Sequence, residues 1–102
     1  MIVEIRLGRD EPVVELIEPD VFTAFKVVLH GGGPSIADTR GVARVDEHAW
    51  IRIDAVRELA GTAATAAWEE SFQGMLGYAR SKGWVDDELD AIRAHVERIR
   101  TV

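Results

Sequence analysis

The chain contains no cysteine, only three prolines and only two lysines in 102 residues. Without cysteine it has no disulfide framework, no thiol nucleophile, no zinc ribbon and no iron–sulfur cluster. No apolar run approaches the roughly 18 residues of a membrane span. Residues 1–6 have neither the basic nor the apolar region of a signal peptide. We therefore expect a cytoplasmic protein that has no membrane partner.

Positive charge is also scarce in this sequence. Twelve Lys and Arg residues stand against 18 Asp and Glu residues, which gives a formal net charge of −6. Nucleic acids and anionic membranes bind surfaces with an excess of positive charge, so neither is an expected partner. Residues 80–102 hold five basic residues, but five acidic residues are interleaved with them. Hydrophobic residues make up 47% of the chain, which is enough for the core of one domain over residues 1–102.

Alternation of apolar and polar residues predicts four strands in two hairpins. Residues 2–7 alternate between apolar and charged side chains, which is the pattern of a half-buried strand. A turn-like segment and an apolar run at 13–18 follow, so these two segments form the first predicted hairpin. Residues 42–45 and 49–53 form the second.

Apolar residues spaced three and four positions apart predict four helices. The segment 21–29 has this spacing, but its apolar residues also alternate, so a strand is the alternative there. The helices are expected at 21–29, at 55–60 with Asp54 as N-cap and Gly61 after its end, from Thr62 or Thr65 to Lys82, and at 86–100.

The last two helices give the strongest patterns of the chain. Gly83 is suited to the left-handed position that ends a helix, and Trp84 would then pack back on its last turn. The final segment starts with acidic residues 86–88 and ends with Arg98 and Arg100, charges that complement a helix dipole. The predicted fold class is α+β: a small antiparallel sheet of two hairpins packed with helices and ending in a C-terminal αα-hairpin.

Motifs for catalysis, nucleotides and metals are incomplete. Residues 30–33 spell HGGG, an oxyanion-loop motif, but the chain has no G-x-S-x-G nucleophile elbow, no P-loop and no dinucleotide-binding fingerprint. The three histidines fall on three different predicted elements, which is unsuited to a metal site. The acidic run 86–90 lacks the glycine and glutamate of a calcium-binding loop. We expect no catalytic residue, no metal and no cofactor.

His48, Trp50 and Arg52 share one face of a predicted strand and form the candidate ligand site. An imidazole, an aromatic ring and a cation together suit a small anionic or aromatic ligand. The glycine-rich loop 31–41 would act as a lid over such a ligand. The alternative is that this face is simply the solvent side of an edge hairpin.

Gly74 and Gly77 interrupt the long predicted helix beside Tyr78, and Trp84 follows its end. Each helical glycine costs about 1 kcal/mol relative to alanine, so a second backbone is expected to approach closely there. We favour an approach within the fold, and an approach across a protein interface is the alternative. With the two aromatic residues, these positions predict a non-enzymatic protein that binds a partner or itself. A small-molecule binder or minor enzyme using the His48 face is the second hypothesis.

Overall fold

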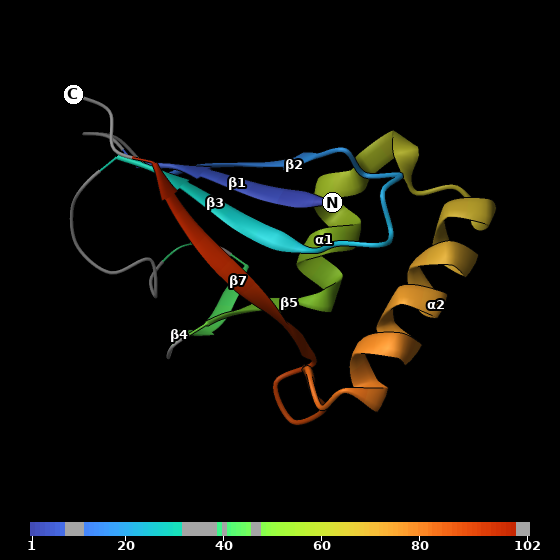
Figure 1. Ribbon diagram of the computed structural model, residues 1–102. Helices are drawn as coiled ribbons and strands as arrows, with labels where there is room; N and C mark the ends of the chain where they lie inside the picture. The colour runs from blue at the N-terminus through green and yellow to red at the C-terminus, as the bar shows by residue number, and fades with distance from the viewer. Residues whose placement is uncertain (8–11, 32–38, 40, 46–47, 100–102) are drawn as a thin grey trace.

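A computed structural model describes residues 1–7, 12–31, 39, 41–45 and 48–99 of the chain (Figure 1). Within these residues it contains seven strands, two α-helices and one short 3-10 helix. In chain order they are β1 (Ile2–Arg6), β2 (Val13–Ile17), β3 (Lys26–His30), β4 (Val42–Val45), β5 (Ala49–Arg52), α1 (Ile53–Ala60), η2 (Gly61–Ala63), α2 (Ala66–Ser81), β6 (Val85–Asp86) and β7 (Ala91–Ile99).

The strands form one mixed sheet in the order β2-β1-β3-β7-β5-β4, which curves as a half-barrel, and β6 pairs with β7 beside this path. The nine-residue β7 is the strand that joins the two parts of the sheet. Its first half, residues 91–94, pairs antiparallel with β5, and its second half, residues 95–99, pairs parallel with β3. The hydrophobic core lies between this sheet and the two helices (Figure 1).

The predicted fold class is wrong in its architecture. Both predicted hairpins exist as β1–β2 and β4–β5, and the chain does combine helices with strands. They belong, however, to one seven-stranded mixed sheet and not to a small antiparallel one. The described residues contain no C-terminal αα-hairpin, because the segment after α2 returns to the sheet.

The predicted helix over 86–100 is instead the turn and strand β6–β7. The Asp86 carboxylate accepts hydrogen bonds from the backbone N–H groups of Glu88 and Leu89, as a helix N-cap also would, but Asp90 has a φ of 52°, which a helix does not allow, and the chain turns into β7 there. Ala91, Ile92 and Ala94 are all less than 3% exposed. This part of β7 pairs with β5 and β6, and its burial outweighs the helical propensity of the segment.

The helix favoured over 21–29 is also wrong, and the strand alternative is the correct one for its second half. β3 begins at Lys26, and Val27, Val28 and Leu29 are all buried. β3 lies between two parallel neighbours, β1 and β7, and such central strands bury consecutive residues instead of alternating ones. This removes the alternation that identified the outer strands.

The ends of α2 are as predicted from its capping residues. The Thr65 hydroxyl accepts a hydrogen bond from the backbone N–H of Trp68, so Thr65 is the N-cap. Gly83 has a φ of 78°, and the backbone N–H of Trp84 donates to the carbonyl of Ala79, as in a Schellman motif. α1 is also present, but its N-cap is Arg52 and not Asp54.

Arg57 on α1 forms an ion pair with a residue of α2. Its guanidinium donates to both carboxylate oxygens of Glu69 at 2.7 and 3.3 Å and to Asp54 at 2.8 Å, and it lies 5.5 Å from the centre of the Phe72 ring. Burial acts to lower the pKa of Arg57, but the hydrogen bonds to Glu69 and Asp54 outweigh burial and raise that pKa. Neither α-helix in the described part of the chain is long and apolar enough to cross a membrane.

Replacing Arg57 with Met should lower the free energy of unfolding by about 1 kcal/mol, since its charge-assisted hydrogen bonds to Glu69, which are partly buried, and to Asp54, which is exposed, are lost. For a domain of this size that corresponds to a drop in Tm of about 4–8 °C. Arg80→Met is the matched control, because Arg80 pairs with Asp87 at the exposed surface. The control should change the free energy by less than about 0.5 kcal/mol. Equal losses in thermal denaturation would show that Arg57 has no special role.

Candidate functional site

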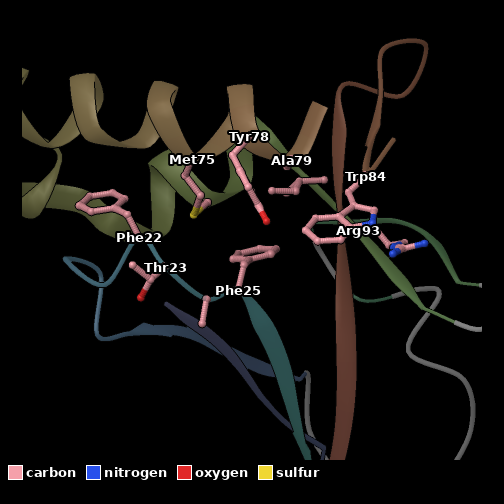
Figure 2. A pocket seen from close by; sticks show the side chains of 10 residues that line it. Phe22, Thr23, Phe25, Met75, Tyr78, Ala79, Trp84 and Arg93 are labelled. Atoms are coloured by element: carbon pink, nitrogen blue, oxygen red, sulfur yellow. The ribbon is translucent and has the colours of Figure 1, made fainter. Parts of the chain in front are cut away.

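An aromatic groove of about 110 Å³ lies between α2, the segment that leads into β3, and the β6–β7 part of the sheet (Figure 2). Figure 2 shows Tyr78 reaching from α2 toward Phe25, with Trp84 beside them. We call this site the α2 groove. It is lined mainly by large apolar side chains and one cation: Phe22, Phe25, Met75, Tyr78, Trp84 and Arg93.

The wall formed by Phe22 and Phe25 belongs to an irregular segment that hydrogen bonds hold in place. The indole N–H of Trp68 donates to the carbonyl of Pro19 at 2.8 Å, and the rings of Phe22 and Trp68 are 6.0 Å apart. The amino group of Met1 donates to the carbonyls of Val21 and Ala24, at 2.9 and 3.0 Å. Core residues therefore fix a segment that has no regular secondary structure of its own.

The opposite wall comes from the last turns of α2 and its C-terminal cap. Because the Schellman motif folds the chain back at Gly83, the Trp84 ring meets the Tyr78 ring edge-on, with centroids 6.0 Å apart. Tyr78 is nevertheless 60% exposed, the highest value among the large hydrophobic residues described. Met75 and Trp84 are half-buried. An apolar surface of the protein thus stays open to solvent at this point.

Two cations lie on the aromatic rings of this groove. The Lys82 ammonium is 5.6 Å from the centre of the Tyr78 ring, and the Arg93 guanidinium is 5.4 Å from the centre of the Trp84 ring. Both distances are typical of cation–π contacts. Among the described residues, neither cation forms an ion pair with a carboxylate. The groove therefore combines apolar rings with positive charge in a chain whose net charge is −6.

The dimensions of the groove limit what it can hold. Pockets for drug-sized ligands and cofactors measure about 300–1,000 Å³, and an apolar cavity of about 150 Å³ holds one benzene molecule. A volume of about 110 Å³ matches a single large side chain.

No set of three or more His, Asp or Glu side chains that could bind a metal occurs in the described part of the chain.

The three residues of the predicted ligand site lie on the β5 strand or next to it. Ala49 and Ile51 belong to the core, whereas Trp50 faces the other side of the sheet and is 8% exposed. The Arg44 guanidinium covers the Trp50 ring at 4.5 Å. His48 is half-buried and Arg52 is exposed. The structure thus brings an Arg to the Trp50 ring that the sequence did not indicate.

The predicted interface residues all lie on or just after α2, but the favoured explanation of the glycines is wrong. A Cβ added at Gly74 or Gly77 meets no atom of the described residues within 4 Å, and both glycines are exposed. No other part of the described chain therefore approaches this face of α2. Tyr78 and Trp84 do come together, at the α2 groove. The interface alternative for Gly74 and Gly77 stays a prediction.

The remaining sequence motif gives no site. Most of the predicted lid, residues 32–38 and 40, lies outside the described residues. His30 ends β3, where its Nε2 lies 3.6 Å from the Glu4 carboxylate. Arg6 also forms an ion pair with Glu4. The HGGG histidine therefore lies beside the Glu4–Arg6 ion pair on β1 and does not form a separate site.

Sequence reasoning missed Phe22, Phe25, Met75 and Arg93 as parts of a site. The first three carry no polar signal, and their spacing fits helix core positions equally well. Arg93 was predicted to lie on a helix. In the structure the β6–β7 pairing lets its backbone N–H donate to the Trp84 carbonyl at 2.7 Å. It is also the cross-strand partner of Trp50, so it lies between the two tryptophans that the sequence singled out.

Replacing Gly74 with Ala should raise the free energy of unfolding by about 0.5–1 kcal/mol, because it lies inside a helix with open space around it. Gly83→Ala is the matched control. It also has open space, but its φ of 78° disfavours any residue with a Cβ, so this change should destabilise by about 1–2 kcal/mol. Chemical denaturation measures both. A loss of stability in Gly74→Ala would mean that other atoms already contact the surface of α2 at Gly74.

The chain was compared with models of known protein families, with curated proteins and with solved structures, and none of the three comparisons gave a match.

Proposed function

We propose that this protein is a non-enzymatic binding module that takes a side chain of another polypeptide into the α2 groove. The observation that carries the proposal is Tyr78, a large aromatic residue that is 60% exposed at the edge of a ready-formed apolar groove. Tyr is among the residue types that most often anchor a protein–protein contact.

The residue types of the groove support protein binding over small-molecule chemistry. Tyr, Trp and Arg dominate the residues that contribute most to protein–protein affinity, and they do so in preformed pockets at the centre of an interface. The α2 groove has one of each in Tyr78, Trp84 and Arg93. Its volume of about 110 Å³ favours one anchor side chain. At the predicted His48, Trp50 and Arg52 site, Arg44 covers the Trp50 ring, so we propose no ligand site there.

Selection from a phage-displayed peptide library on the immobilised wild-type protein tests this function. We expect enriched peptides whose affinity falls at least about tenfold in the Tyr78→Ser variant, as for the loss of an interface anchor. Val13→Ser is the matched control, since Val13 is 51% exposed but lies on β2 and does not line the groove. Because both side chains are exposed, both variants should keep the wild-type Tm within a few degrees.

The proposal would be contradicted by peptides that bind Tyr78→Ser as tightly as wild type. It would be contradicted equally by a selection that enriches no peptide at all.

A further inference from the structure

Building on the proposed function, we infer that the α2 groove selects an acidic segment: one apolar anchor side chain with carboxylates beside it in the sequence. The anchor lies among the rings of Phe25, Tyr78 and Trp84, and the carboxylates meet Lys82 and Arg93. This assigns the partner by its chemistry, as an acidic peptide segment of another protein.

The two cations at the groove are available because they rest on rings and not on carboxylates. Lys82 lies over Tyr78 and Arg93 over Trp84, at 5.6 and 5.4 Å. A ring face attracts a cation but leaves its outer N–H donors free for an anion. Among the described residues no ion pair uses either cation, although the chain has more acidic than basic residues.

Two nearby acidic residues are already paired with other bases. Asp87 forms an ion pair with Arg80 at 3.2 Å, and Asp86 forms one with Arg44 at 3.2 Å. None of the residues that line the groove is acidic. Among the described residues no carboxylate therefore pairs with Lys82 or Arg93, and a carboxylate from outside would find donors without displacing an existing partner.

The positions of the cations suggest how such a segment is recognised. Tyr78 and Trp84 are in contact with each other, and each holds one cation on its ring, so both positive charges lie beside the aromatic pair that borders the groove. An anchor side chain in the groove would therefore lie near both cations. In an extended segment neighbouring residues are about 3.3 Å apart along the chain, so carboxylates next to the anchor can reach both cations.

A second copy of this chain is a less suitable occupant. Its most acidic exposed segment is the turn 86–90, and two of the carboxylates there, on Asp86 and Asp87, already form ion pairs within their own chain. Two copies would also each bring a net charge of −6 to the interface. We therefore propose that the occupant of the groove is a different polypeptide, and the experiment below distinguishes it from a second copy of this chain.

The test uses three synthetic peptides: one Phe flanked by two Asp on each side, the same peptide with Lys in place of Asp, and the first peptide with Ala in place of Phe. Binding is followed by the indole N–H signal of Trp84 in ¹H–¹⁵N spectra of the full chain. We expect the Asp–Phe peptide to bind at least about tenfold more tightly than either of the others. Its affinity should also fall as salt rises, because the contacts are solvent-exposed.

Variants of the protein assign the effect to the two cations. Lys82→Gln and Arg93→Gln should each weaken binding of the Asp–Phe peptide about five- to tenfold, while Arg93→Lys keeps most of the affinity because it keeps the charge. Arg98→Gln is the control: Arg98 is an exposed cation on the same strand, five residues from Arg93 and outside the groove. It should bind as wild type does.

Each contrary result has a distinct meaning. Equal binding of the Asp–Phe and Lys–Phe peptides overturns the acidic preference but leaves the docking function intact. If none of the three peptides binds, while library-selected peptides still depend on Tyr78, the acidic preference is likewise overturned and the docking function stays intact. Failure of both sets overturns the docking function itself. Trp84 signals that change with protein concentration alone, and not in Tyr78→Ser, identify a second copy as the occupant and overturn the inference.

Discussion

The pairing of β7 with three other strands is the constraint on which this structure depends. Its first half pairs with β5 and β6, and its second half pairs with β3. The two hairpins β1–β2 and β4–β5 are joined into one sheet only through this strand, because β3 connects the first to β7 and β5 connects the second. Ile92 and Ala94, at 2% and 1% exposure, place this strand at the centre of the core.

The α2 groove is a consequence of that pairing. β6 and β7 bring Arg93 next to Trp84, and the Schellman turn after α2 sets Trp84 against Tyr78. The far wall comes from the segment before β3, which is fixed because Trp68 on α2 bonds to the Pro19 carbonyl. The segment 22–25 therefore meets the end of α2 and the start of β7, which are far from it in sequence, at one small opening (Figure 2). No single one of them contains the site.

The parts that sequence reasoning predicted correctly are those decided by local chemistry. Strands with one polar face, such as β1, show alternation directly, and the caps Thr65 and Gly83 mark both ends of α2. For β3 the strand was only the alternative prediction, because its consecutive buried residues 27–29 lack alternation. β7 was predicted as a helix. In β7 the spacing of Ile92 and Val96 fits a helix as well as a strand, and only long-range pairing decides between them.

The candidate site likewise contains residues that local sequence patterns indicate and residues that they do not. Tyr78 and Trp84 were named from the sequence, because an aromatic pair near interrupting glycines is visible along one helix. Phe25 and Arg93 were not, since their relation to that pair exists only after β3 and β7 have formed. The cation on Trp84 in particular depends on a strand pairing that no local pattern indicates.

The most direct test of this account is the backbone chemical shifts of residues 91–99 in solution, measured with the cross-strand proton contacts of the same segment. The account predicts the Cα and Cβ shifts of an extended strand. It also predicts contacts between Trp84 and Arg93 and between Lys26 and His95. Helical shifts over 91–99 without these contacts would contradict it, because the sheet would then lose its central strand and the groove would lose Arg93.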